Sequence, residues 1–403
     1  MPAVRPRLLP LAIVLIALCA CDEDGGGASS TALHCDPDAV PVLIASKSDD
    51  DDGDGNILDE HFPEIDDEDD DIADHTWIRD HHGTYHLFFN NEGRGAPWFI
   101  EHYTTRTLDH IEYAGTALAA QPGAWDAGGM WAPHVFEVAG MYYMTYTGLD
   151  RVDVGATQRI GLAVSRDLAH WERVKVNRCA GTTGDGCIYE CDEAWTLWGD
   201  DGNLFNQQCR DAFVMRDDEH DRWLLFATAR STNGYGVVTV AESQDLTTWT
   251  GAGFVDATRR LAGGVGAQTT GGQCENPFVV RHDTTNFLLF TDWQDPEDSL
   301  DVAIPRTIVQ YATSSALDVD AGGSPGWTYR GSIPDPGINA IEVIEYGLGT
   351  CIMSQSISNR HSGYNRPIRR MLRLKCIDWT GATTFRTVTV GFGEDDASSL
   401  TRP

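Results

Sequence analysis

The chain has 403 residues, of which 61 are Asp or Glu and 29 are Lys or Arg, so its formal charge is −32. A surface this acidic repels phosphate backbones and argues against a nucleic-acid partner, while a hydrophobic content of 41% excludes wholesale disorder. Abundant glycine, tryptophan and tyrosine, with scarce lysine, favour short strands and tight turns over helices.

Residues 1–21 have the pattern of a signal peptide. Two arginines precede an apolar run at residues 8–20, which is too short to span a membrane comfortably. The run ends Leu-Cys-Ala-Cys, which resembles a bacterial lipobox, and in that interpretation Cys21 is lipidated and becomes the mature N-terminus. An ordinary signal peptide cleaved elsewhere is the alternative. Either interpretation predicts an exported chain, and the first predicts a lipoprotein anchored to a membrane in the periplasm or at the cell surface.

Residues 22–71 are predicted to form an acidic, disordered linker. From Asp49 to Asp71 there are 14 carboxylates and no Lys or Arg, and self-repulsion keeps such a run extended. Within it, three residues follow the opening of a calcium-binding loop, although His61 stands where the closing glutamate belongs. The alternatives are a plain spacer and a weak structural calcium site at Asp50, Asp52 and Asp54.

An exported chain reaches an oxidising compartment, where its cysteines can form disulfides. Apart from the two in the lipobox there are eight, an even number that predicts up to four disulfides: Cys35, Cys179, Cys187, Cys191, Cys209, Cys274, Cys351 and Cys376. The spacing of Cys187 and Cys191 is close to that of zinc ligands, but no suitably placed pair of histidines follows, which favours disulfides. The segment from Cys179 to Cys209 is a long insertion that we expect to lie on the same face as the candidate site.

Residues 72–393 are predicted to form one repeated all-β domain, followed by a tail at residues 394–403. The motif Ser-x-Asp-Leu-x-x-Trp occurs at residues 165–171 and 243–249 and closes segments of apolar strands. Five such segments contain strands at residues 85–89, 141–146, 223–226, 287–290 and 350–353. Five units of about four strands predict a five-bladed β-propeller, with a two-sheet sandwich as the alternative.

A second strand begins ten to twelve residues before each of those five strands. Its first residues are Asp74, Trp131, Asp211, Glu275 and Asn339. In a propeller these positions would form a ring around one mouth of the central channel. Clustered carboxylates disfavour one another's ionisation, which costs stability, and glycoside hydrolysis uses such a pair, one protonated and one ionised. Acids that only form turns, or a metal ring with His75 and His134, are the alternatives.

Several motifs resemble those of the five-bladed propeller glycosidases. Trp-Ala-Pro-His-Val at residues 131–135 is similar to the W-A-P-x-V of glycoside hydrolase family 43. Arg210-Asp211 resembles the R-D-P of the related invertase and levansucrase families 32 and 68, and Cys274-Glu275, followed by Pro277, falls between the motifs of the two groups.

The resemblance implies a role for each acid. Asp74 matches the general base of family 43, or the nucleophile of invertases; Asp211 matches the acid that tunes the proton donor, and Glu275 the general acid. It also implies a carbohydrate substrate, with pentofuranosides or xylosides expected first and fructosides second. No cofactor is expected to be required, because no Gly-rich phosphate loop leads from a strand into a helix. Five further residues are expected to bind substrate, Trp131 by stacking on a sugar face, namely Trp131, Arg210, His75, His134 and Asn339. A non-catalytic carbohydrate-binding propeller is the rival from another class.

Overall fold

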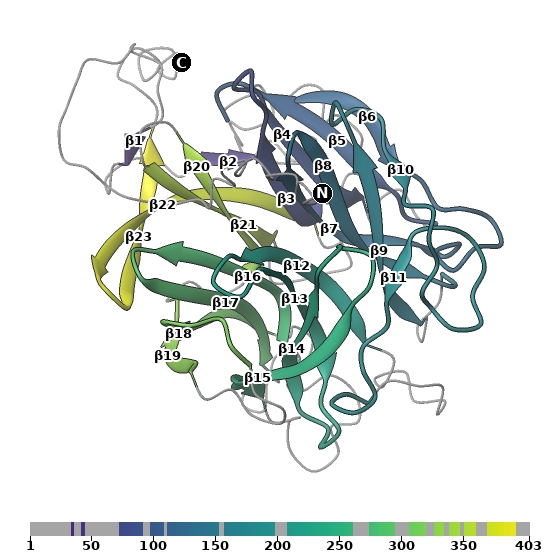
Figure 1. Ribbon diagram of the computed structural model, residues 1–403. Coiled ribbons are helices and arrows are strands. Elements are labelled where there is room, and N and C mark those ends of the chain that lie inside the picture. The colour runs from purple at the N-terminus through teal and green to yellow at the C-terminus, as the bar shows by residue number, and fades with distance from the viewer. Residues whose placement is uncertain are drawn as a thin grey trace, which may run out of the picture.

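The computed structural model describes residues 34–35, 42–44, 72–91, 97–108, 111–152, 157–197, 208–260, 274–294, 306–319, 326–333, 338–346, 350–359 and 369–391. Every regular element in this part of the chain is a β-strand (Figure 1). Among these residues there is accordingly no helix long and apolar enough to cross a membrane. The predicted signal peptide, the tail and most of the predicted linker lie outside the described residues.

The strands form five sheets, here called blades I to V in chain order. Blade I contains β3 (Ile72–Arg79), β4 (Tyr85–Asn91), β5 (Ile100–Thr105) and β6 (Glu112–Leu118). Blade II contains β7 (Gly129–Val138), β8 (Met141–Leu149), β9 (Gln158–Ser165), β10 (Glu172–Arg173) and β11 (Cys187–Tyr189). Blade III contains β12 (Cys209–Asp217), β13 (Arg222–Arg230), β14 (Gly236–Ser243) and β15 (Thr250–Arg260). Blade IV contains β16 (Cys274–His282), β17 (Thr285–Gln294), β18 (Arg306–Ser314) and β19 (Thr328–Ser332).

Blade V contains β20 (Ile338–Tyr346), β21 (Thr350–Asn359), β22 (Arg369–Gly381) and β23 (Thr384–Gly391), joined by two short N-terminal strands, β1 (His34–Cys35) and β2 (Val42–Ile44). The first strand of each blade contacts the first strand of the next, and β20 contacts β3, so the ring is closed. The prediction of an all-β five-bladed propeller is confirmed, and the two-sheet sandwich is wrong.

The repeated motif has a physical explanation in the turn that it forms. Ser165 accepts hydrogen bonds from the backbone amides of Asp167 and Leu168, and Leu168 adopts a φ of 64°. Trp171 then donates its indole N–H to the Leu168 carbonyl at 2.9 Å. The second copy makes the same bonds through residues 243–249. Each copy therefore provides hydrogen-bond partners for the backbone groups of a tight turn. This turn leads the chain from the third strand of its blade to the next strand at the edge.

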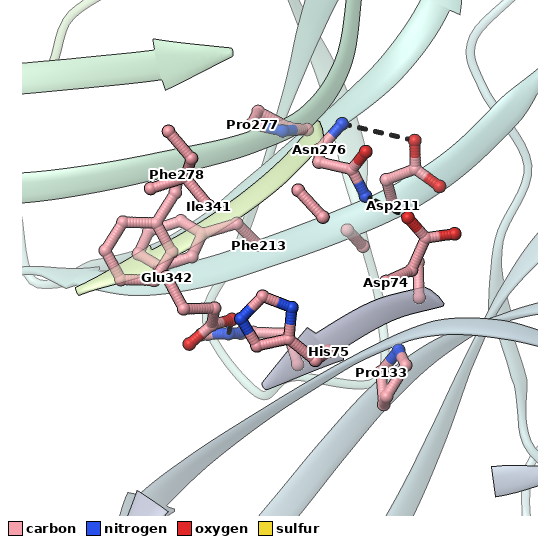
Figure 2. A pocket seen from close by; sticks show the side chains of 14 residues that line it. Asp74, His75, Pro133, Asp211, Phe213, Asn276, Pro277, Phe278, Ile341 and Glu342 are labelled. Carbon is pink, nitrogen blue, oxygen red and sulfur yellow. Dashed lines mark hydrogen bonds and ion pairs between the residues drawn. The ribbon is translucent and has the colours of Figure 1, made fainter. Parts of the chain in front are cut away.

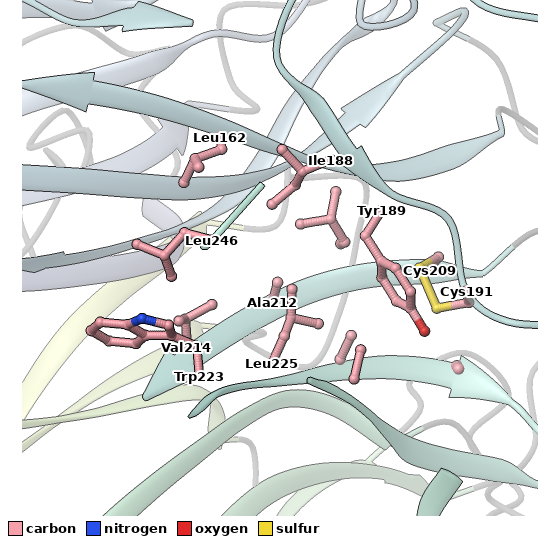
Figure 3. Close-up of a cluster of buried hydrophobic side chains, with 14 of the residues drawn as sticks. Leu162, Ile188, Tyr189, Cys191, Cys209, Ala212, Val214, Trp223, Leu225 and Leu246 are labelled. Atoms are coloured by element: carbon pink, nitrogen blue, oxygen red, sulfur yellow. A yellow bond between two sulfur atoms is a disulfide. The ribbon is translucent and has the colours of Figure 1, made fainter. Parts of the chain in front are cut away.

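Blades II and III are joined by a continuous apolar core (Figure 3). Leu162 of β9 and Ile188 of β11 pack in the same cluster as Val214 and Leu225 of blade III. These strands carry apolar residues on both faces because each blade packs against two neighbours. The insertion supplies part of this core, since β11 adds to the blade II sheet by pairing with β9.

Two disulfides fix the insertion, Cys179–Cys187 and Cys191–Cys209. The zinc alternative for Cys187 and Cys191 is therefore wrong, because both sulfurs are in disulfides. Cys209 is the first residue of β12, so the second disulfide anchors the insertion to the strand that carries Asp211. Cys274 lies outside these bonds, and its thiol donates to the Thr258 carbonyl.

The N-terminal strands correct the prediction of a disordered linker at residues 22–71. β1 pairs with β23 and β2 pairs with β22, both antiparallel, and a third disulfide joins Cys35 to Cys376 in β22. Val42–Ile44 is a short apolar run that lies opposite Leu372–Leu374. Blade V is therefore completed by residues that precede blade I in the chain, and the prediction does not hold for these two segments.

Candidate active site

The innermost strand of every blade carries the same β-bulge near its start. One extra residue interrupts the register of β3, β7, β12, β16 and β20. Each bulge contains one non-glycine residue with φ between 43° and 57°, and these are Asp74, Ala132, Asp211, Asn276 and Ala340. This conformation costs roughly 1–3 kcal/mol at each such position. Bulges of this kind redirect side chains and are frequent beside active sites.

The bulges correct the predicted ring. Asp74 and Asp211 occupy the bulge position, whereas Trp131, Glu275 and Asn339 lie one residue before it. The residue equivalent to Glu275 in blade III is therefore Arg210 and not Asp211. The five predicted residues do lie at the same mouth, but in two adjacent registers.

A cavity opens at this mouth and continues into the channel (Figure 2). Its volume is about 310 Å³, part of which is open to solvent, and it is lined by residues from all five innermost strands. Asp74 and Asp211 lie close together at one side of it, and Glu342 and His75 lie away from them (Figure 2). The cavity therefore combines an acidic wall with a more apolar interior formed by Phe213, Phe278 and Ile341.

Asn276 connects the two aspartates. Its side-chain amide donates to Asp74 Oδ1 at 3.0 Å, and its backbone N–H donates to Asp211 Oδ2 at 3.2 Å (Figure 2). Thr228 on β13 also donates to Asp211 Oδ2, at 2.8 Å. Neither Asn276 nor Thr228 was predicted to belong to the site. Asn276 could have been found as the polar residue that directly follows Glu275.

Arg210 connects Asp211 to the third predicted acid. Its Nη2 lies 2.6 Å from Glu275 Oε1, and its Nε lies 3.4 Å from Asp211 Oδ2. The Arg210 side chain is only 7% exposed, and its Nη1 donates to Gln158 at 3.3 Å. The structure thus brings Asp74, Asp211 and Glu275 together through Asn276 and Arg210, and the Arg210 guanidinium is directed at Asp211 and Glu275.

The environment of Asp211 strongly raises its affinity for a proton. Burial raises the pKa of Asp211 to about 7, the Arg210 charge opposes this increase, and the charges of Asp74 and Glu275 add to it. Desolvation therefore outweighs the ion pair with Arg210. A carboxyl group with a pKa near neutrality can hold or release a proton at the pH at which most enzymes work.

Two tryptophans form an aromatic corner next to the cavity. The ring centroids of Trp98 and Trp131 are 5.4 Å apart with planes inclined at 44°, and Trp131 directly precedes Ala132 in the cavity wall. Gly129 permits this approach, because a Cβ at that position would lie 2.8 Å from the Trp98 backbone nitrogen. Trp98 was not predicted, since it lies between two strands of blade I and only the folded chain places it beside blade II.

The predicted histidines lie deeper in the channel. His75 is buried, and neither of its ring nitrogens has a hydrogen-bond partner among the described residues. Burial lowers its pKa to about 3, so the ring is neutral near pH 7. His134 lies 3.6 Å from the buried carboxylate of Glu342. Burial raises the pKa of Glu342, and the interaction with His134 partly counteracts this increase. Asn339 is the second residue of β20, where it lies opposite Ser356 in β21.

Within the described segments, no three His, Cys, Asp or Glu residues lie close enough to hold a metal ion. The predicted metal ring is therefore not formed by these residues. The calcium candidates Asp50, Asp52 and Asp54, like the lipidation candidate Cys21, lie outside the described residues.

A closed five-bladed ring with an acid-lined mouth defines the class of protein as a propeller glycoside hydrolase. The family described as glycosyl hydrolases family 43 matches residues 69–320, and the chain belongs to that family. It is a glycosidase, and its substrate is a carbohydrate.

Solved structures share the fold at low sequence identity. An endo-1,4-beta-xylanase from Bacteroides thetaiotaomicron is 15% identical with a TM-score of 0.55, over 80% of this chain and 97% of that one. An alpha-L-arabinanase from Cellvibrio cellulosa, complexed with arabinohexaose, is 16% identical with a TM-score of 0.52, over 83% and 98%. A family-32 beta-fructofuranosidase from Bombyx mori is 14% identical with a TM-score of 0.53, over 91% and 68%. No curated protein sequence matches the chain.

Proposed function

We propose that this glycosidase hydrolyses O-glycosidic bonds of arabinose- or xylose-containing polysaccharides or oligosaccharides, with Glu275 as general acid and Asp74 as general base. The observation that carries the proposal is the linkage of Asp74, Asp211 and Glu275 through Asn276 and Arg210 at one mouth of the channel. The arabinanase and xylanase among the similar structures agree with this substrate class.

In the proposed reaction Glu275 donates its proton to the glycosidic oxygen as the bond to the anomeric carbon breaks. Asp74 accepts a proton from the water whose oxygen bonds to that carbon. The products are a sugar with a free anomeric hydroxyl and the alcohol of the leaving group. Arg210, which is also paired with Asp211, holds the Glu275 carboxyl in place, and the corner formed by Trp98 and Trp131 offers a surface for a sugar ring.

A fructoside is the second candidate substrate. The Arg210-Asp211 pair resembles the invertase motif, and the Bombyx mori enzyme shares the fold. In that case Asp74 would attack the anomeric carbon itself and form a covalent intermediate that water then hydrolyses. The stereochemistry of the first product, followed by NMR, separates the two routes, because direct attack of water inverts the anomeric centre and the covalent route retains it.

The test is release of reducing sugar from arabinan, xylan, fructan and galactan by the full chain. Glu275→Gln is expected to lower kcat at least about 100-fold, the size of a general acid's contribution. Glu219→Gln is the matched control, because Glu219 is exposed in the turn between β12 and β13, at the far end of the blade. Equal activity of the wild type and Glu275→Gln would contradict the assignment, and activity on fructan alone would favour the second candidate.

We also propose that the chain is an exported lipoprotein with the lipid on Cys21. The three disulfides support an oxidising compartment. Labelled palmitate supplied to a bacterial host that expresses the full-length gene is expected to enter the wild-type protein and not the Cys21→Ser variant. Equal labelling of both would contradict lipidation at Cys21.

A further inference from the structure

Arg230 is the last residue of β13 and lies at the same mouth as the acids. Thr228, two residues earlier, donates to Asp211. Because side chains alternate along a strand, Arg230 is on the same face of blade III as Thr228. At a rise of about 3.3 Å per residue, the two α carbons are separated by roughly 7 Å. Arg230 therefore lies two residues further along β13 toward the mouth than Thr228, which holds Asp211.

The charge of Arg230 is not neutralised by any carboxylate of the described residues. Its Nε donates to the Gly234 carbonyl at 3.0 Å, and burial lowers its pKa. Five other buried or partly buried arginines each lie within 4.0 Å of a carboxylate, namely Arg159, Arg173, Arg210, Arg216 and Arg222. In a chain with a net charge of −32, a partly desolvated guanidinium beside the site therefore has donors available for an external anion.

The insertion holds the backbone around Arg230 in place. The Leu197 amide donates to the Arg230 carbonyl at 2.8 Å, and Thr196 forms a β-bridge with Ser231. The disulfide between Cys191 and Cys209 ties the same segment to the start of β12. The Arg230 side chain is itself restrained by the bond from its Nε to the Gly234 carbonyl, so it loses less rotamer freedom when it binds a ligand.

We propose that Arg230 binds the anionic group of an acidic sugar, either the carboxylate of a uronate or a sulfate ester, in the subsite next to the acids. The inference rests on the proposed carbohydrate hydrolysis and specifies its substrate. Guanidinium groups bind such oxygens through paired hydrogen bonds, which neutral hydroxyls do not match. The acidic surface opposes the approach of an anion, so selectivity for an acidic sugar has to come from this local contact.

The test compares matched pairs of ligands by calorimetry on the full chain. One pair is a glucuronate-substituted xylo-oligosaccharide and its carboxyl-reduced form, and the other is a sulfated galacto-oligosaccharide and its desulfated form. The wild type is expected to bind the acidic member of one pair roughly 10- to 100-fold more tightly, the range for a hydrogen bond to a charged group. The pair that shows the preference identifies the anion.

Arg230→Gln is expected to lower the affinity for the acidic member to that of its neutral partner, and Arg230→Lys to restore part of the difference. Arg281→Gln is the matched control: Arg281 also donates to a backbone carbonyl, but in the turn after β16 at the other end of its blade. A preference that persists in Arg230→Gln, or a wild type with no preference in either pair, overturns the inference. Each of these proteins also carries Glu275→Gln, so that no ligand is hydrolysed during the titration and a failure of the proposed hydrolysis remains distinguishable.

Discussion

Replacing Asp211 by Asn is expected to change how the stability of the protein depends on pH. Burial raises the pKa of Asp211 from 3.8 to about 7 in the folded chain, so the folded state keeps a proton that the unfolded state releases near pH 4. The stabilisation from that proton is complete below about pH 4 and is lost as the pH rises to about 7. Asn has nearly the same shape, carries no charge and does not titrate, so the variant lacks this loss.

The size of the effect follows from the difference between the two pKa values. A difference from 3.8 to about 7 corresponds to about 4 kcal/mol in the free energy of unfolding. The Asp211 side chain is only 5% exposed, so solvent screening reduces this value little. The unfolding free energy of Asp211→Asn relative to wild type should therefore increase by up to about 4 kcal/mol between pH 4 and pH 7.

Urea unfolding of both proteins, at intervals across that pH range, measures the difference directly. Asp218→Asn is the control, since its side chain is 58% exposed, and its stability relative to wild type should vary much less with pH. A difference between Asp211→Asn and wild type that stays constant with pH would refute the reasoning. It would mean that Arg210 keeps Asp211 ionised at every pH, and that the ion pair outweighs burial.

Three further predictions follow from other contacts. Trp98→Ala should raise KM about fivefold with little change in kcat, because the aromatic corner contributes about 1 kcal/mol to sugar binding; steady-state kinetics in which KM stays the same would contradict this. The double variant Cys191→Ser, Cys209→Ser should lose about 3 kcal/mol of stability in urea without reductant, and a loss below about 1 kcal/mol would show that the insertion is held by packing. Burial lowers the pKa of His102 to about 3, so the wild type loses stability as the pH falls below 6.5; His102→Gln should lose less on thermal unfolding at acid pH, and an equal loss would rule out His102 as the cause.

The sequence predicted the blades because their signals are local. The Ser-x-Asp-Leu-x-x-Trp turns and the apolar strands depend on residues close together in the chain, and they recur at regular spacing. Asp74, Asp211 and Glu275 were found in the same way, as acids near the start of repeated strands. All three do lie at one mouth in the structure.

The bulges escaped prediction because their residues give no local sign. A residue with positive φ is expected to be glycine, yet Ala132 and Ala340 adopt this conformation as well as Asp74 and Asp211. The strain is tolerated because the same pairing is imposed in all five blades. Without knowledge of the bulges, the sequence does not show that Asp211 occupies the bulge position and that Glu275 lies one residue before it.

Other features depend on contacts between distant residues. Asn276 donates to Asp74 across 202 positions of the chain, and Trp98 meets Trp131 only when blades I and II pack. The pairing of Cys35 with Cys376 joins residues 341 apart. Spacing alone allows many disulfide arrangements, so only the fold selects one.

The bond between Cys35 and Cys376 also determines how the molecule would respond to mechanical load. A pull on the chain upstream of Cys35 passes through the sulfur atoms into β22, in the last blade, before it can reach Ile72 at the start of the first blade. The bond closes the polypeptide between Cys35 and Cys376 into a covalent loop, so a pull applied between the two chain ends is carried by the disulfide and not along this loop. Tension on the segment before Cys35 would therefore enter the fold through β1 and β22 of blade V and not through β3, which carries Asp74.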